Sequence, residues 1–394
     1  MTLFEALLSA RGRELLTRLA GLAGQGVPPA GELRLAAALR AEFPASLVAG
    51  ALAQHELRLR ARGKFRLAME MFFTRAGLEQ ASSEAVARYR AARYAGARRV
   101  ADLCCGIGGD LIALAEGRRA VALDRDPLHL RMAAANTEVY GVAAGVATVL
   151  SDVRDADLAG IDAAFVDPAR RTGQRRLRAG DSEPPLDWCL GLAGRVGRVG
   201  IKAAPGIARG AAPPGWELEF IAIGRDLKEA VLWSPALATG PARATILPAG
   251  HTLTSGTPGP VAVRMPGEFL LDPNPAVTRA GLVADLARMT GTWKIDARIA
   301  FLSADTPVLT PFARTLRVID SAPWKQKQLP AKLRALDIGV VDIRRRGLAG
   351  DVTELHRRLK LSGSRRATLV MTRVRNLPWC LVCLDVEEPT GIPG

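Results

Sequence analysis

Residues Val100 to Asp110 read VADLCCGIGGD, and this stretch predicts the fold. An apolar run typical of a buried strand leads into Gly106, Gly108 and Gly109, and the helix-forming sequence LIALAEG follows. Glycine permits a tight turn with positive φ and lets backbone approach a ligand, because no Cβ stands in the way. This order is typical of a cofactor site for a nucleotide-like molecule at the carboxyl edge of a parallel sheet. A turn that serves tight packing alone is the alternative.

The sequence around this turn alternates short apolar runs with helical stretches. Buried parallel strands are predicted at 99–105, 120–124, 147–152, 163–168 and 199–205. Two further runs within 216–235 are separated by a short turn through Arg225 and Asp226, which predicts a hairpin. We therefore predict a doubly wound α/β domain over 98–237, with a mostly parallel sheet that ends in an antiparallel hairpin.

The flanking sequences predict different structures. Apolar residues recur at helical spacing over 1–97, which favours an all-helical domain, with one helix over 3–24 and another over 84–95 that Ser83 caps. Residues 238–270 are rich in Pro, Gly and Thr and predict a linker or small irregular extension. A basic α/β region is predicted over 271–394, with strands at 340–346, 367–374 and 378–386 and a helix at 351–361.

Acidic residues end three successive strands: Asp102, Asp124 and Asp152. A dinucleotide fingerprint would place glycine where Leu111 stands, and carboxylates are unfavourable beside a pyrophosphate. They suit a cofactor that carries an ammonium and a sulfonium charge and no phosphate, which describes S-adenosylmethionine. Asp124 is positioned to accept hydrogen bonds from ribose hydroxyls, and Asp152 from an adenine amino group, although capping or turn roles remain open for Asp152 and Asp126. The predicted cofactor-binding residues are Asp102, Cys104, Gly106, Gly108, Asp110, Asp124, Arg125, Asp152 and Val153.

The fourth strand ends in FVDPARRTG, which predicts a catalytic turn of Asp167, Pro168, Ala169 and Arg170. Methyl transfer is an in-line displacement, so the protein mainly orients the acceptor and receives its proton. An Asp-Pro turn presents a carboxylate and a free carbonyl to an incoming amino group. A simple strand-to-loop turn is the alternative. Lys202, which follows in the fifth strand, either faces the substrate or is solvated.

These motifs together resemble the class I S-adenosylmethionine-dependent methyltransferases. With LEQASS at 78–83, the VDPAR turn and the basic C-terminal segment, the chain is similar to bacterial members that carry a C-terminal THUMP-like domain. The resemblance implies that Asp102, Gly106 and Gly108 line the methionine part of the cofactor. Because THUMP domains grip structured RNA, it also implies an RNA substrate.

The catalytic turn departs from a familiar pattern. Methyltransferases that act on amino groups of bases usually carry Asp/Asn-Pro-Pro followed by an aromatic ring, whereas this chain has Ala169 and Arg170. The motif D-P-x-R-x-G is similar to the uridine C5 enzymes, but these need a cysteine after the fifth strand and KAAPGI has none. A ring or exocyclic nitrogen is therefore the preferred target, and the atom stays open.

Charge favours a polyanionic partner. The formal net charge is +15, and residues 312–376 hold sixteen Lys and Arg against five Asp and Glu. An Arg-rich composition is the plainer explanation, since only eight of the 54 basic residues are Lys. The predicted substrate-binding residues are Lys202, Arg344, Arg345, Arg346, Arg373 and Arg375.

Other classes of site receive no support from the sequence. No apolar run approaches the roughly 20 residues of a membrane helix, and with no export signal the cytoplasm is the expected compartment. Cys380 and Cys383 form a C-x-x-C within a predicted strand, where they point to opposite faces, so no metal site is expected.

The sequence thus predicts a cytoplasmic RNA methyltransferase that uses S-adenosylmethionine. A non-catalytic module that senses the cofactor and binds RNA is one alternative, and an enzyme acting on a small molecule or protein is another. The oligomeric state stays open.

Overall fold

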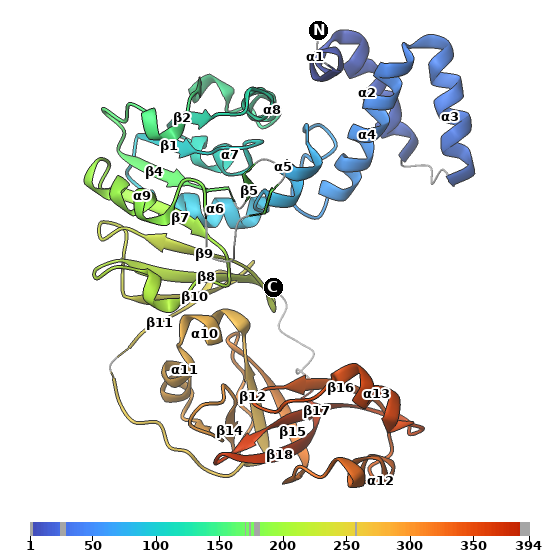
Figure 1. The fold of residues 1–394 in the computed structure, drawn as a ribbon, viewed down its shortest axis with the longest axis vertical. Helices are drawn as coiled ribbons and strands as arrows, with labels where there is room; N and C mark the ends of the chain where they lie inside the picture. Colours follow the sequence, from blue (N-terminus) through green and yellow to red (C-terminus); the bar gives the residue numbers. More distant parts are fainter. Residues whose placement is uncertain are drawn as a thin grey trace. The chain divides into compact units, whose positions relative to one another are not determined.

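The computed structural model describes residues 3–23, 29–169, 171–172, 175–176, 182–256 and 258–386. The chain divides into two compact units, shown along the chain in Figure 1. The first unit comprises Met1–Gly206 with Val231–Ala238, and the second comprises Ile207–Ala230 with Thr239–Gly394. Each unit has its own sheet strands and core.

The first unit begins with helices, as the apolar spacing predicts. They are α1 (Leu3–Leu8), α2 (Ala10–Ala23), α3 (Pro29–Glu42), α4 (Ala45–Ala61), α5 (Arg75–Gln80) and α6 (Glu84–Ala92). The single helix predicted over 3–24 is wrong, because the chain breaks at Ser9, whose Oγ donates to the Ala6 carbonyl at 2.6 Å and accepts from the Gly12 N–H. Ser83 precedes α6 as predicted, but its hydroxyl makes no capping hydrogen bond.

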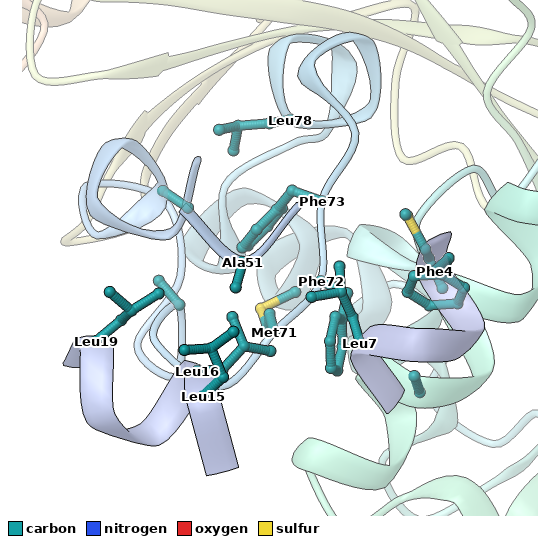
Figure 2. Close-up of a cluster of buried hydrophobic side chains, with 14 of the residues drawn as sticks. Phe4, Leu7, Leu15, Leu16, Leu19, Ala51, Met71, Phe72, Phe73 and Leu78 are labelled. Carbon is teal, nitrogen blue, oxygen red and sulfur yellow. The ribbon is translucent and has the colours of Figure 1, made fainter. Parts of the chain in front are cut away.

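These helices share one hydrophobic core with the α/β part of the unit. Figure 2 shows Phe4 and Leu7 of α1 beside Phe72 of the segment that precedes α5. The same cluster contains Ile107 of the glycine turn and Met132 of α8 (Pro127–Val139). Burying these side chains from both parts contributes on the order of 1.5–3 kcal/mol each. The helical part is therefore packed directly against the elements that form the predicted cofactor site.

The central strands of the first unit are β1 (Arg99–Leu103), β2 (Arg119–Asp124), β3 (Val146–Leu150), β4 (Ala163–Val166) and β7 (Arg198–Ala203). Their order is β7-β4-β1-β2-β3, and every neighbouring pair is parallel, which confirms the predicted parallel sheet. The prediction of a buried strand at 147–152 is wrong, because β3 lies at the edge of the sheet and residues 147–150 are exposed. The carboxyl ends of all five strands consequently meet at one edge. The helices of this part are α7 (Gly109–Ala115), α8 and α9 (Leu186–Gly191), and the short strands β5 (Arg171–Thr172) and β6 (Arg175–Arg176) pair with each other.

The predicted hairpin is confirmed. β8 (Glu217–Ile223) and β9 (Asp226–Trp233) are neighbours in the sheet and are joined by a turn through Gly224 and Arg225, so they run antiparallel. The division between the units falls within β9, because Val231–Ala238 belong to the first unit.

The prediction of an irregular linker after the hairpin is wrong for much of 238–270. β10 (Ala242–Leu247) pairs in parallel with β8, and β11 (His251–Thr254) pairs antiparallel with β10. The helix α10 (Pro275–Ala280) packs on β8 and β10. The prolines and glycines that suggested a linker lie mostly between and after these strands rather than within them.

The second unit also contains a seven-stranded sheet in the order β13-β14-β12-β15-β18-β17-β16. Only β16 and β17 are parallel among the pairs described, and the predicted strands and helix of this region are confirmed. The strands are β12 (Phe269–Pro273), β13 (Trp293–Lys294), β14 (Leu302–Ala304), β15 (Ala313–Pro323), β16 (Ile338–Arg345), β17 (Arg365–Val374) and β18 (Leu377–Asp385), with helices α11 (Val283–Thr290), α12 (Leu329–Ala335) and α13 (Val352–Leu359).

The described residues form neither a membrane-spanning helix nor a metal-binding cluster. No helix among them is long and apolar enough to span a bilayer. The same residues contain no cluster of three or more His, Cys, Asp or Glu side chains arranged to hold a metal ion.

Candidate functional site

Gly106 and Gly108, in the turn after β1, have different roles. Both are left-handed, with φ of 53° at Gly106 and 83° at Gly108. A Cβ on Gly108 would lie 3.1 Å from the Cβ of Ala133, so this position serves close packing on α8. A Cβ on Gly106 would meet no described atom within 4 Å. Gly106 therefore leaves open space beside the backbone, as a ligand-binding turn requires.

Asp102 is a buried carboxylate without a partner. It lies on β1 with 1% of its surface exposed, and neither of its oxygens accepts a hydrogen bond from the described residues. Burial and the nearby carboxylates of Asp110, Asp167 and Asp124 raise its pKa well above the usual range, and Arg90 opposes this shift. An orphaned buried carboxylate is costly by itself and is relieved by a cation. The site therefore fits a cofactor that brings positive charge.

Asp110, in contrast, has a partner in the protein. Arg90 of α6 is 1% exposed, forms an ion pair with Asp110, and donates to Ser82 Oγ at 2.8 Å. Its guanidinium also lies over the Phe165 ring, 4.6 Å from the centroid. Arg90 thus holds Asp110 next to the glycine turn. Nothing in the sequence indicated this role of Arg90.

Asp124, at the end of β2, is fixed by two backbone amides. The N–H of Gly106 donates to Oδ2 at 2.8 Å, and the N–H of Asp126 donates to Oδ1 at 2.9 Å. A carboxylate has about four acceptor positions, so both oxygens can still accept from a ligand. Asp126 itself caps α8, accepting from the N–H groups of Leu128 and His129, in line with the capping alternative.

Asp152 follows β3 and is engaged within the chain. Both of its oxygens accept from the Arg154 guanidinium, at 2.9 and 2.6 Å, and it caps the 3-10 turn Val153–Asp155. Hydrogen bonds from Arg154 lower the pKa of Asp152 to about 2. Val153 is buried and Arg125 is exposed near Asp152. The capping alternative is realised, and any role toward a ligand would be shared with Arg154.

The predicted catalytic turn meets Lys202 at the carboxyl edge. The Lys202 Nζ lies 2.6 Å from Asp167 Oδ2 and donates to the Gln80 carbonyl at 3.2 Å. The side chain of Lys202 is only 7% exposed, so the alternative that it is solvated is wrong. Pro168 is buried, and Ala169 exchanges backbone hydrogen bonds with Glu183. Arg170 lies outside the described residues.

The cysteine of the glycine turn is unsuited to nucleophilic work. Cys104 is half-buried and has a φ of 63°, which is unusual for a residue with a Cβ. Burial, with the carboxylates of Asp124 and Asp167 nearby, raises the pKa of its thiol. The thiol therefore stays protonated at neutral pH.

The predicted arginines of the second unit fall into two groups. Because β16 and β17 are parallel, their carboxyl ends meet at the same edge. The arginines at these ends are Arg344 and Arg345 in β16, Arg346 just after it, Arg373 in β17 and Arg375 just after it. Arg344 and Arg375 are exposed, with no side-chain partner in the described structure. The other three have partners: Arg345 donates to the Gly350 carbonyl, Arg346 pairs with Asp272 at 3.0 Å, and Arg373 donates to Asn376.

Two further arginines join the group around Asp272. Arg225, in the β8–β9 turn, pairs with Asp272 at 2.7 Å. Burial lowers the pKa of Arg225, and the positive charges of Arg344, Arg314 and Arg346 lower it further. Sequence reasoning missed Arg225 and Arg314, because only the fold brings the hairpin turn and β15 close to Asp272 of β12.

Comparison with known proteins agrees with this geometry. The C-terminal region, residues 313–384, matches a family described as THUMP domain-like, and residues 97–179 match one described as RNA cap guanine-N2 methyltransferase. Residues 1–61 match a domain of unknown function. An uncharacterised S-adenosylmethionine-dependent methyltransferase of Mycobacterium tuberculosis is 39% identical over 77% of this chain and 85% of its own length, in each of two strains. The crystal structure of a methyltransferase candidate from Porphyromonas gingivalis has the same fold, with a TM-score of 0.72 at 21% identity over 88% of this chain and 92% of that one.

The parallel sheet with its reversed hairpin, the glycine turn and the acidic strand ends define a class I S-adenosylmethionine-dependent methyltransferase. More particularly, the chain belongs to the bacterial family of these enzymes that carries a C-terminal THUMP-like domain, together with the M. tuberculosis methyltransferase. Its cofactor is S-adenosylmethionine.

Proposed function

We propose that this methyltransferase modifies a nitrogen of a base in RNA. The observation that carries the proposal is the Lys202–Asp167 pair, which lies at the same sheet edge as the orphaned Asp102. The description of the family that matches residues 97–179, with guanine N2 as its target, supports an exocyclic nitrogen. The THUMP-like region supports RNA as the molecule that carries the base.

Three carboxylates would hold the cofactor. Asp102 and the open backbone at Gly106 would face its methionine part, where the positive charges lie. Asp124 would accept from the ribose hydroxyls with the lone pairs that its two backbone donors leave free. Asp152, backed by Arg154, would receive the adenine. The bound cofactor supplies the methyl group.

The work of the chain's own residues at the acceptor is orientation and proton transfer. Lys202 occupies Oδ2 of Asp167, while Oδ1 accepts no hydrogen bond from the described residues. Oδ1 would accept an N–H of the target amino group and so aim the nitrogen lone pair. The carboxylate would then take the proton that the nitrogen loses on methylation. Lys202 fixes the position of this carboxylate through its contact with Oδ2.

The exposed arginines of the second unit would hold RNA phosphates. Arg344 and Arg375 have no side-chain partner among the described residues, whereas Arg225 and Arg346 are already paired with Asp272. Arginine binds phosphate with two parallel hydrogen bonds, so unpaired guanidinium groups are suited to this contact. Binding would weaken steeply as salt rises, because each neutralised phosphate releases counterions.

The test is methyl transfer to RNA in vitro. Total RNA from a strain that lacks the protein is incubated with the purified enzyme and tritiated cofactor, then digested to identify the labelled nucleoside. We expect label in one N-methylated nucleoside with wild-type enzyme, and none with Asp167→Ala while calorimetry still detects cofactor binding. Label in a carbon-methylated or ribose-methylated nucleoside would contradict the proposed atom.

The two alternatives predict other outcomes. A cofactor-sensing RNA-binding module would bind cofactor and RNA but leave every RNA unlabelled. An enzyme for a small molecule or protein would leave RNA unlabelled and label a cell extract from which RNA has been removed.

A further inference from the structure

A large hollow lies at the amino edge of the parallel sheet, the opposite end of the strands from the carboxylates of the cofactor site. Its volume is about 740 Å³, within the usual range of small-molecule sites. The first residues of β1 and β2, Arg99 and Arg119, line it, so the strand length of roughly 15 Å separates it from the turn at Gly106. None of the residues proposed to act in methyl transfer lines this hollow.

Four arginines line the hollow: Arg98, Arg99, Arg118 and Arg119. Arg118 is anchored, since its guanidinium donates to the carbonyls of Ala91 and Leu114. The side chains of the other three are exposed and have no hydrogen-bonding or ionic partner among the described residues. Arg99 and Arg119 are also register partners on adjacent parallel strands, an arrangement in which like charges repel.

The acidic residue of the lining, Asp162, offsets only part of this charge. Its Oδ2 accepts from the backbone N–H groups of Arg98 and Arg99, at 2.8 and 2.9 Å. These two hydrogen bonds lower the pKa of Asp162, and the positive charge of Arg98 lowers it further. The lining still carries an excess of positive charge, which a bound anion would compensate.

Three glycines leave parts of the wall without side chains. Gly117, Gly141 and Gly160 line the hollow, and each has a φ of 70° or 71°. A Cβ on Gly117 or Gly141 would meet no described atom within 4 Å, and one on Gly160 would lie 3.0 Å from the Arg99 guanidinium. The glycines thus leave room in front of the arginines, and Gly160 lets the Arg99 guanidinium lie against backbone.

We propose that this hollow is an anion site that binds phosphate groups through Arg98, Arg99 and Arg119. Guanidinium groups match phosphate with paired, charge-assisted hydrogen bonds. The phosphate belongs either to a free nucleotide or to the backbone of a nucleic acid, and the chemistry of recognition is the same. The proposal does not depend on RNA methylation, because it concerns the other edge of the sheet.

The test uses two probes, inorganic pyrophosphate by calorimetry and a fluorescent oligouridylate by anisotropy. Arg98→Ala/Arg119→Ala removes two guanidiniums from the hollow. The matched control, Arg60→Ala/Arg62→Ala, removes two exposed arginines at the end of α4 and leaves the same net charge. We expect the first variant to lose about tenfold or more in affinity for pyrophosphate, and the control to lose little.

A second variant tests shape without changing charge. The substitution Ala144→Trp places a large side chain at an exposed position of the lining. It should fill the hollow and weaken binding although all four arginines remain. Thermal unfolding and cofactor binding should stay at wild-type values in every variant, because the changed residues are exposed and none of them belongs to the proposed cofactor site.

The outcomes separate the sources of phosphate. Loss for pyrophosphate alone identifies a free nucleotide, and loss for both probes identifies a nucleic acid backbone. For the oligouridylate, removal of two phosphate contacts should also reduce the salt slope by about 1.4. Equal losses in the hollow variant and its control, or no binding of either probe by the wild type, would overturn the proposal and leave the methyl-transfer assay unaffected.

Discussion

The Nζ of Lys202 lies 2.6 Å from Oδ2 of Asp167, so a cation of β7 and the carboxylate that follows β4 form one pair at the carboxyl edge of the sheet. The lysine is buried and is also held by the Gln80 carbonyl, which comes from the segment before the first strand. The helical part of the first unit thus helps to position the pair. This pair is the part of the site that a merely cofactor-binding protein would not need.

Replacing Lys202 by Met should uncouple chemistry from cofactor binding. Without the lysine, Oδ2 of Asp167 loses the contact that fixes it, so the carboxylate no longer holds the acceptor nitrogen in line with the methyl group. We expect kcat to fall about 100-fold, while the affinity for the cofactor stays at the wild-type value. The measurements are kcat and, by calorimetry, the Kd of the cofactor for the two proteins.

Lys228→Met is the matched control, since Lys228 also pairs with an aspartate, Asp226, but at an exposed position. Its kcat should equal that of the wild type. A wild-type kcat for Lys202→Met would mean that the Lys202–Asp167 pair does not take part in methyl transfer.

Replacing Arg90 by Met should destabilise the fold strongly. It leaves Asp110 buried and unpaired beside Asp102, and removing one partner of a buried ion pair costs about 3–5 kcal/mol. Urea denaturation measures the loss, and the double variant with Asp110→Asn should recover most of it. Arg18→Met, at an exposed pair with Glu14 and Glu42, should change the stability little, because water screens an exposed ion pair. Similar losses at Arg90 and Arg18 would count against the buried pair.

Replacing Cys104 by Ala should preserve methyl transfer. Its thiol has a raised pKa, so little thiolate exists near neutral pH to act as a nucleophile. For the same reason iodoacetamide should alkylate Cys104 more slowly than it alkylates free cysteine at pH 8. Loss of activity in Cys104→Ala with cofactor binding intact would reopen a covalent mechanism.

Replacing Arg344 and Arg375 by Gln should weaken RNA binding without affecting folding. Both side chains are exposed, and each lost phosphate contact should lower the slope of log K against log salt by about 0.7–0.9. Arg346→Gln should instead lower the melting temperature, because it leaves Asp272 short of one of its two partners. A salt slope that stays the same in the double variant would remove these two arginines from the RNA-binding surface.

The sequence predicted the parallel sheet because its strands read as apolar runs that end in polar or glycine residues. β1, β2, β4 and β7 are largely buried, whereas β3 lies at the edge of the sheet and is exposed. It also predicted the glycine turn and the acidic strand ends, since these are local in sequence. The single helix over 3–24 failed because the hydrogen bonds of Ser9 are visible only in three dimensions. β10 was missed because prolines and glycines around it dominate the local composition.

The hydrogen bonds and ion pairs between residues of the site could not be predicted from the sequence. Nothing in the spacing distinguishes Asp102, which has no partner in the described structure, from Asp110, which Arg90 neutralises, or from Asp152, which pairs with Arg154. These partnerships join residues of different elements, so they depend on how the helices dock on the sheet. Arg225 and Asp272 illustrate the same limit in the second unit.

The assignment of the cofactor site depends mainly on Asp102. Its buried carboxylate, without a partner among the described residues, lowers the stability of the free protein, and the same carboxylate would bind the positive charge of the cofactor. The folded state raises its pKa, so it binds more protons than the unfolded state, and stability is lost as pH rises from the usual value of about 3.9 through the folded pKa. Asp102→Asn abolishes this loss. The stabilisation by the substitution should therefore grow over that pH window and then level off.

The most direct measurement compares wild type and Asp102→Asn at neutral pH, by thermal unfolding and by calorimetry with S-adenosylmethionine. We predict that the variant melts at a higher temperature and binds the cofactor at least about tenfold more weakly, because a charge-assisted contact is worth about 1.5–3 kcal/mol. A variant that binds the cofactor as tightly as the wild type would contradict the account, whatever its melting temperature.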